Sequence, residues 1–169
     1  MVKVYFLLGG NLGDRLATIR HALDALSEAV GPVIARSSIY ETEPWGIQDQ
    51  PTFLNQTAIL ESSCTPLEIL AVIHRIEREL KRERIEKWGT RTIDVDILFY
   101  GDQIYEDEEL SIPHPALHER NFTLVPLLEM APKLTHPRLG KTIEQLYDQS
   151  PDPLGTNLFK AVEHIHRHN

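Results

Sequence analysis

Residues 65–100, TPLEILAVIHRIERELKRERIEKWGTRTIDVDILFY, predict a helix that leads into a buried strand. Thr65 and Glu68 form the pattern of a capping box around Pro66, and proline is common at the first position of a helix. Apolar residues then recur at spacings of three and four, as expected for a helix that buries one face (Ile69, Ile73, Ile76, Leu80). The apolar run over residues 93–100 is typical of a strand.

Upstream of this stretch, apolar runs flank an amphipathic repeat. Residues 2–8 are apolar except for Lys3 and predict a first strand, which a glycine-rich turn follows. Leucine and isoleucine then recur at helical spacing until Gly31-Pro32, a pair that ends helices (Leu12, Leu16, Ile19, Leu23, Leu26). Residues 33–42 and 53–61 hold β-branched and aromatic side chains and predict two further strands.

The order strand, helix, strand, strand, helix, strand predicts an α+β protein. It is the order of the ferredoxin-like folds, whose antiparallel sheet has helices packed on one face. Beyond residue 101 the pattern is weaker, and it predicts short helices near 122–130 and 143–147. We expect residues 1–169 to form a single domain, with a loose C-terminal extension over residues 150–169.

Composition limits the partners of the chain. Seventeen basic and twenty-five acidic residues give a formal net charge of −8, which opposes a general attraction to nucleic acid or to an anionic membrane surface. The apolar start is too short to span a membrane and lacks the basic leader of a secretory signal. Cys64 is the single cysteine, as is typical of a reducing compartment. We therefore expect a cytoplasmic protein that binds neither nucleic acid nor membrane.

The strand over residues 93–100 carries two aspartates in an otherwise apolar run. Because side chains alternate along a strand, Asp94 and Asp96 point to the same face, with Cα atoms about 6.5–7 Å apart. Two unpaired carboxylates in an apolar strand are costly unless a cation compensates them, and carboxylate oxygens suit magnesium. The pattern predicts a Mg²⁺ site, and salt bridges to nearby arginines are the alternative.

The segment before this strand is basic, although the chain as a whole is acidic. Residues 75–91 hold seven basic and four acidic side chains, a net charge of +3. Arginine binds phosphate oxygens in a bidentate manner, so arginines directly before a metal site indicate a polyphosphate ligand. The alternative is a solvated helix face with ion pairs one turn apart. The neighbouring Trp88, Gly89 and Arg91 favour the ligand.

Two other groups of residues are candidates for substrate contacts. Prolines on both sides fix the backbone at His114, and Arg120 and Phe122 follow closely enough to face the same cavity. A fixed histidine beside an arginine suits phosphate, whereas a lone histidine is more often structural. Around the loop after the second strand, an aromatic ring and an amide suit a flat heterocycle (Thr42, Pro44, Trp45, Phe53, Asn55).

Several of these motifs, in this order, closely resemble one known family. They are the glycine turn at 9–13, the basic pair Arg82 and Arg84, the block WGTRTIDVDIL at 88–98, and the Pro-His-Pro element at 113–115 with the arginine and phenylalanine after it. Together they resemble 6-hydroxymethyl-7,8-dihydropterin pyrophosphokinase of folate biosynthesis. The resemblance extends to about residue 147, and the block with the two aspartates is its most specific part.

The resemblance implies a ferredoxin-like fold, ATP as co-substrate and two magnesium ions. The implied reaction transfers a pyrophosphoryl group from ATP to the hydroxymethyl group of the pterin, giving AMP and the pterin diphosphate. The implied catalytic residues are Arg82, Arg84, Arg91, Asp94 and Asp96, of which the two aspartates hold the magnesium. The implied ATP-binding residues are His74, Glu77, Trp88, Arg91, Ile97, Ser111, His114 and Arg120. The implied pterin-binding residues are Thr42, Pro44, Trp45, Phe53, Asn55 and Phe122.

The chain departs from the family pattern at Gly10, Lys81 and Thr90, and the last two bear on the closure of the basic loop. Two other functions stay open. A metal-dependent nucleotide hydrolase would use the same aspartates but transfer to water. An RNA-binding module would use phenylalanine and arginine on a sheet of the same topology, but the net charge and the paired aspartates argue against it.

Overall fold

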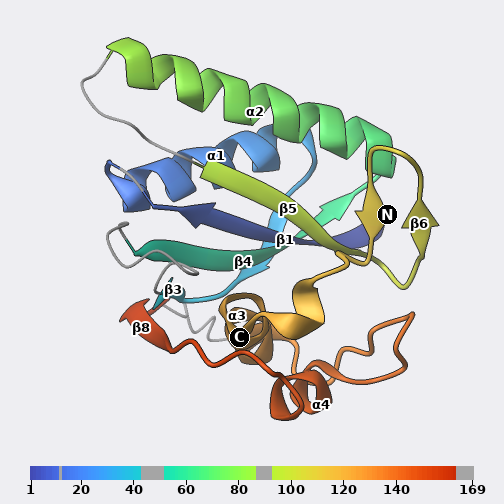
Figure 1. Ribbon diagram of the computed structural model, residues 1–169. Helices are drawn as coiled ribbons and strands as arrows, with labels where there is room; N and C mark the ends of the chain where they lie inside the picture. Colours follow the sequence, from blue (N-terminus) through green and yellow to red (C-terminus); the bar gives the residue numbers. More distant parts are fainter. Residues whose placement is uncertain (12, 43–51, 87–92, 163–169) are drawn as a thin grey trace, which may run out of the picture.

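The structure, a computed structural model, describes residues 1–11, 13–42, 52–86 and 93–162, with the backbone alone over 82–86 (Figure 1). Its centre is an antiparallel sheet in the order β5-β1-β4-β3-β8, with β2 also paired to β4. The strands of this sheet are β1 (Val2–Gly10), β2 (Val33–Arg36), β3 (Ile39–Thr42), β4 (Phe53–Ser62), β5 (Ile93–Tyr100) and β8 (Thr156–Lys160). A separate hairpin pairs β6 (Tyr105–Glu106) with β7 (Ser111–Ile112).

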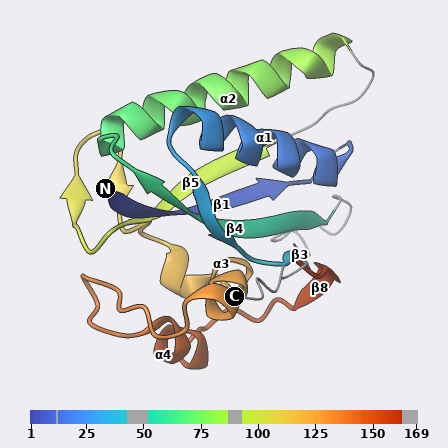
Figure 2. The same ribbon diagram turned by 180° about the vertical axis from the view of Figure 1, so that it is seen from behind.

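Helices cover both faces of the sheet. Helices α1 (Arg15–Ala29) and α2 (Pro66–Glu86) lie on one face, and the turn η1 (Leu117–Glu119) with α3 (Asn121–Met130) and α4 (Ile143–Asp148) lies on the other (Figures 1 and 2). Each face has its own cluster of buried apolar side chains. The predicted α+β fold is confirmed, but the expectation of helices on one face only is wrong, because the C-terminal helices bury the second face. Within the described residues, no helix is long and apolar enough to cross a membrane.

The start of α2 has the predicted capping box. The Thr65 N–H donates to Glu68 Oε1 at 3.0 Å, and the Glu68 N–H donates to Thr65 Oγ1 at 3.2 Å. These two bonds satisfy backbone donors that the first turn of a helix otherwise leaves unpaired. The predicted apolar stripe of α2 is buried against the sheet (Ile69, Ile73, Ile76, Leu80).

A β-bulge divides β5 into two registers. Asp94 and Asp96 lie opposite Gly9 and Leu7 of β1. Further along, Ile97 pairs with Phe6 and Phe99 pairs with Tyr5. Leu98, between them, has no partner on β1. A bulge interrupts the alternation of faces. Leu98 and Phe99 therefore both join the cluster on the α3 face, while Tyr100 joins the cluster on the α1 and α2 face.

The turn between α1 and β2 depends on a glycine. Gly31 has φ +152°, and a Cβ there would lie 1.9 Å from the carbonyl oxygen of Glu61 on β4. The Glu61 N–H donates to the Pro32 carbonyl at 3.1 Å, and the Ser62 hydroxyl donates to the Val30 carbonyl at 2.8 Å. The end of α1 is therefore held directly against β4, as the predicted stop at Gly31-Pro32 requires.

Residues 33–42 form two strands and not the one expected, because the chain breaks at two buried serines. Ser37 Oγ accepts the Thr57 N–H of β4 at 3.0 Å, so a side chain takes the place of a regular strand contact. The Ser38 N–H and hydroxyl donate to the Glu129 carboxylate of α3 at 2.9 and 2.6 Å. The Tyr40 hydroxyl donates to the same carboxylate at 2.7 Å, which anchors the C-terminal end of α3 to β3.

The end of the described chain also differs from the expectation of a loose extension. Residues 156–160 form β8, which pairs antiparallel with β3 from Thr42↔Thr156 to Ile39↔Lys160. The Val162 N–H donates to Ser38 Oγ at 3.0 Å, and the Arg15 guanidinium lies 5.5 Å from the centre of the Phe159 ring. This segment is therefore part of the sheet and its edge.

We expect Gly31→Ala to lower the free energy of unfolding by about 2–4 kcal/mol, because the new Cβ forces β4 and the turn apart. Urea denaturation followed by circular dichroism measures this loss. Gly140→Ala is the matched control, since Gly140 has φ +68° with nothing within 4 Å of the added Cβ. The control should lose about 1–2 kcal/mol from backbone strain alone. Equal losses for both variants would contradict the contact with Glu61.

Candidate active site

The candidate site begins with a row of three residues across the sheet. Asn55 of β4, Gly9 of β1 and Asp94 of β5 lie opposite one another in the antiparallel register, so their side-chain positions share one face. A Cβ at Gly9 would lie 2.7 Å from Asn55 Oδ1, so the absence of a side chain there leaves room for the amide. Leu7 and Asp96 form the next row on the same face. Both aspartates therefore point to the α3 face, as the period of two predicted.

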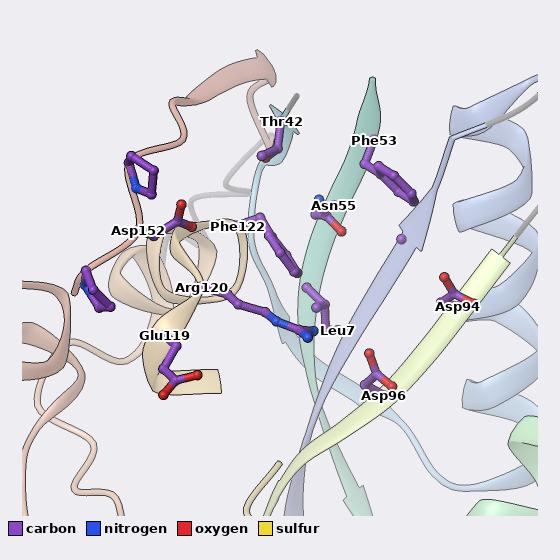
Figure 3. A pocket seen from close by; sticks show the side chains of 13 residues that line it. Leu7, Thr42, Phe53, Asn55, Asp94, Asp96, Glu119, Arg120, Phe122 and Asp152 are labelled. Atoms are coloured by element: carbon purple, nitrogen blue, oxygen red, sulfur yellow. The ribbon is translucent and has the colours of Figure 1, made fainter. Parts of the chain in front are cut away.

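A cavity of about 960 Å³ lies between this face and the N-terminal end of α3. Figure 3 shows Phe53 on the strand side and Phe122 on the helix side, with Asn55 between them and the two aspartates at the β5 edge. The rings and the amide thus surround one space, as the sequence predicted for a flat heterocycle. The cavity is lined by Leu7, Gly9, Thr42, Phe53, Asn55, Asp94, Asp96, Glu119, Arg120, Phe122, Pro151, Asp152 and Pro153.

Two buried polar side chains, Thr42 and Asn55, line this cavity. Thr42 Oγ1 is buried and makes no hydrogen bond within the described part of the chain. Asn55 is 4% exposed. Because an unpaired buried hydroxyl is costly, a bound ligand that hydrogen-bonds to it would recover that free energy.

A second cavity, of about 670 Å³, lies on the other side of the aspartates. Its lining comes from α2, β5, the loop between β6 and β7, β7, the Pro-His-Pro loop and the residue before α3. The lining residues are Leu70, Ile73, His74, Glu77, Asp94, Val95, Asp96, Ile97, Asp107, Glu108, Glu109, Leu110, Ser111, His114, Pro115 and Arg120. Three residues line both cavities: Asp94, Asp96 and Arg120. The two cavities therefore meet at two carboxylates and one guanidinium group.

Asp96 lies in an environment that disfavours its negative charge. Burial raises the pKa of Asp96, the charge of Asp94 raises it further, and His114 and Arg120 oppose these effects. His114 Nε2 lies 4.0 Å from Asp96 Oδ1. Burial in turn lowers the pKa of His114. A cation between the carboxylates would relieve the repulsion between Asp94 and Asp96.

His114 is held in one orientation by the backbone around it. Its N–H donates to the Leu98 carbonyl of β5 at 3.1 Å, which holds the Pro-His-Pro loop against the sheet. Its Nδ1 accepts the Ala116 N–H at 3.2 Å. In the neutral ring the proton therefore lies on Nε2, the nitrogen that faces Asp96.

Glu77 connects α2 to the strand that carries the aspartates. Its Oε1 accepts the Val95 N–H at 3.3 Å. Burial raises the pKa of Glu77, and the nearby charge of Asp94 adds to this shift. Glu77 therefore adds a third carboxyl group to the same region of the second cavity.

Arg120 and Phe122 form a pair at the start of α3. The guanidinium carbon of Arg120 lies 5.6 Å from the centre of the Phe122 ring, within the range of a cation–π contact. Figure 3 shows the Arg120 side chain extended from η1 and α3 toward the strands. A contact of Phe122 with a ligand would therefore also affect the position of Arg120.

A comparison of the sequence with protein families shows the family to which the chain belongs. Residues 5–132 match the model of 7,8-dihydro-6-hydroxymethylpterin-pyrophosphokinase, well over half of the chain. The chain belongs to this pyrophosphokinase family. It is therefore an enzyme, a diphosphokinase that uses ATP as co-substrate.

Individual relatives agree with this membership. The chain is 40% identical over 153 residues to 2-amino-4-hydroxy-6-hydroxymethyldihydropteridine pyrophosphokinase of Haemophilus influenzae, covering 90% of this chain and 95% of the relative. It is 43% identical over 143 residues to the Synechocystis enzyme of the same name, covering 84% of this chain and 73% of the relative. A solved structure of Plasmodium falciparum HPPK-DHPS matches with a TM-score of 0.71 at 19% identity and supports the fold alone. That match covers 88% of this chain but 45% of the Plasmodium chain.

The structure brings together most of the pyrophosphokinase residues proposed from the sequence. Around the first cavity these are Thr42, Phe53, Asn55, Phe122, Asp94 and Asp96, and around the second they are His74, Glu77, Ile97, Ser111, His114 and Arg120. Pro44, Trp45, Trp88 and Arg91 lie outside the described residues. Arg82 and Arg84 lie in α2, where the backbone alone is described.

Sequence reasoning missed part of the cavity lining. Pro151, Asp152 and Pro153 line the first cavity, although the segment was expected to be a loose extension. The signal that could have found them is the aspartate between two prolines, which is typical of a rigid turn and not of a disordered tail. Residues 107–110 of the second cavity carry no pattern that marks them as part of a site.

Proposed function

We propose that the chain transfers a pyrophosphoryl group from ATP to the hydroxymethyl group of 6-hydroxymethyl-7,8-dihydropterin, giving AMP and the pterin diphosphate, in folate biosynthesis. The observation that carries this proposal is that two cavities of different lining share Asp94, Asp96 and Arg120. Transfer between two substrates requires both to approach one charged centre. We further propose that residues 1–169 act as one domain in the cytoplasm, where the single Cys64 stays reduced.

The aromatic cavity suits the pterin. A flat ring between Phe53 and Phe122 gains stacking contacts on both faces (Figure 3). The Asn55 amide offers both donors and an acceptor, and the unpaired Thr42 hydroxyl offers a further contact for the polar edge of the ring. Pro44 and Trp45 belong to this cavity by the family resemblance.

The polar cavity suits ATP. His74, Glu77 and Ser111 supply polar contacts there, and Ile97 supplies an apolar one. Arg120 and His114 lie where the phosphate chain would pass the aspartates, and a guanidinium group binds phosphate oxygens in a bidentate manner. Trp88, Arg82, Arg84 and Arg91 belong to this site by the family resemblance.

Asp94 and Asp96 fit magnesium as ligands. No group of three or more metal-binding side chains occurs within the described ranges, so the protein offers these two carboxylates. Two are sufficient, because magnesium takes its other ligands from water and phosphate oxygens. We propose two ions, the number that the resemblance implies, which when bound would neutralise phosphate charge and acidify the attacking hydroxyl group.

The residues of the two cavities act mainly by positioning. Stacking on Phe53 and Phe122 would hold the hydroxymethyl group toward the aspartates, and Arg120 with His114 would hold the phosphates for in-line attack. Phosphoryl transfer needs alignment and charge neutralisation more than covalent chemistry from the protein. The paired carboxylates beside a guanidinium group support this mode of catalysis.

We expect Asp94→Ala and Asp96→Ala each to lower turnover by about three orders of magnitude, because charge neutralisation by the metal contributes several kcal/mol in the transition state. Steady-state kinetics in magnesium measures the loss. Asp102→Ala is the matched control, since Asp102 is an exposed aspartate in the turn directly after β5. Near wild-type turnover of either folded site variant would refute the metal assignment.

We expect Phe122→Ala to weaken pterin binding by about 1–3 kcal/mol, on the scale of a base stacked on an aromatic ring. Nucleotide affinity should stay nearly unchanged. Isothermal titration calorimetry with each ligand separates the two affinities, and Phe159→Ala removes an exposed ring outside both cavities as a control. Equal losses for pterin and ATP would mean that the pterin does not stack on Phe122.

The reaction itself is tested by its products. With ATP, magnesium and the hydroxymethyl pterin, ³¹P NMR should detect AMP and a pterin diphosphate, because the attack is at the β phosphorus. ADP with a pterin monophosphate would reject pyrophosphoryl transfer. Consumption of ATP at the same rate without the pterin would instead favour a nucleotide hydrolase.

A further inference from the structure

The start of α3 carries two side chains that the proposed function places on different substrates. Arg120, which lines both cavities, immediately precedes the helix, and Phe122 is its second residue. Asn121 lies between them as the first helical residue. A small rotation of this backbone would therefore move the guanidinium group and the aromatic ring together.

The segment before β8 holds this backbone in place. The Asn121 N–H donates to Asp152 Oδ2 at 2.8 Å, and the Asn121 side-chain amide donates to the Asp152 carbonyl at 3.3 Å. The other carboxylate oxygen of Asp152 accepts the Leu154 N–H at 2.9 Å, and the Asp152 N–H donates to Ser150 Oγ at 3.3 Å. Both carboxylate oxygens of Asp152 are thus fixed by backbone groups.

This contact replaces a local helix cap. The N-cap residue of α3, Arg120, makes no side-chain capping bond, so a carboxylate from 31 positions along the chain satisfies the first backbone donor. A negative charge is also favourable at the N-terminal end of a helix. A guanidinium group has only donors and cannot cap a helix start, and the Arg120 side chain instead extends into the cavity (Figure 3).

We propose that Asp152 is a positioning residue, which sets Arg120 and Phe122 for the reaction by fixing the backbone of Asn121. This inference rests on the proposed function of the two cavities. Asp152 lies beyond residues 5–132, the part of the chain that matches the family model, and is part of the cavity wall together with Pro151 and Pro153. The C-terminal segment thereby determines the geometry of the site without providing a catalytic residue.

The opposite end of α3 provides the comparison that separates positioning from general stability. There the Glu129 carboxylate accepts bonds from the Ser38 N–H, the Ser38 hydroxyl and the Tyr40 hydroxyl, away from both cavities. Removal of Glu129 should loosen the helix at the far end. Removal of Asp152 should loosen it where the two substrate contacts begin.

The experiment compares Asp152→Ala, Asp152→Asn and Glu129→Ala in steady-state kinetics and thermal unfolding. Asp152→Ala should raise KM for both the pterin and ATP and lower kcat by about tenfold each, because Phe122 and Arg120 move together and small misplacements at a reacting centre are costly. Asp152→Asn should recover most of both parameters, since its amide oxygen can still accept the Asn121 N–H. Glu129→Ala should lower Tm but leave the pterin KM near wild type. Asp148→Ala, an exposed aspartate on α4, controls for the loss of charge.

Amide hydrogen exchange gives a readout that does not depend on activity. Exchange at Asn121 should accelerate at least tenfold in Asp152→Ala and stay near wild type in Glu129→Ala. A wild-type pterin KM and kcat in Asp152→Ala would overturn the proposal. The proposal would also be overturned if Asp152→Ala and Glu129→Ala raised KM for the pterin and KM for ATP to the same extent. If the wild-type enzyme itself fails to form AMP and the pterin diphosphate, the proposed function fails. Unchanged exchange at Asn121 in Asp152→Ala separately refutes the positioning role of Asp152.

Discussion

Strand β1 pairs along nearly its whole length with β4 on one side and β5 on the other, and the position of each site residue on the sheet depends on these two registers. The register with β4 places Asn55 beside Gly9, and the register with β5 places Asp94 on the other side of the same glycine. A slip by one residue on either side would turn the polar side chains from the α3 face to the α1 and α2 face. The apolar clusters on both faces oppose such a slip, because a shift by one residue would turn the carboxylates of β5 into the cluster under α1 and α2 and turn its isoleucine and valine side chains toward the polar cavity.

The electrostatics of the site follow from this burial. The sheet holds Asp94 and Asp96 in neighbouring rows, and Glu77 approaches the same strand from α2. Burial raises the pKa values of Asp96 and Glu77, so this part of the site holds its negative charge unfavourably. Binding of cations therefore releases free energy that folding has already expended. A cation at these carboxylates would also offset the charge of an anionic substrate, so the net charge of −8 does not argue against nucleotide binding.

The sequence was informative where the interactions are local. The period of two around Asp94 and Asp96 and the stripe of α2 with its Thr65 capping box were each predictable, because neighbours within a few residues decide them. The break at Ser37 and Ser38 was not, since it depends on Thr57 and Glu129, which are distant in the chain. Strand β8 has exposed Leu158 and Phe159 and so lacks the alternation that marks a half-buried strand. The contact of Asp152 with α3 was not predictable either, because its partner Asn121 is 31 residues away in the chain.

The bulge at Leu98 divides β5 into two parts whose side chains alternate in opposite phase. Up to Ile97 the strand keeps the phase that presents two carboxylates to the cavities, and from Phe99 it keeps the opposite phase, in which Tyr100 turns to the other face and its hydroxyl donates to the Cys64 carbonyl at 2.7 Å. The unpaired Leu98 accommodates this shift of one residue in the register with β1. A change in packing at the Tyr100 end can therefore be absorbed at the bulge, while the end that carries the two aspartates retains its register. A strand of eight residues thus consists of two short parts: the register of the first places the carboxylates at the cavities, and the register of the second places Phe99 and Tyr100 in the two apolar clusters.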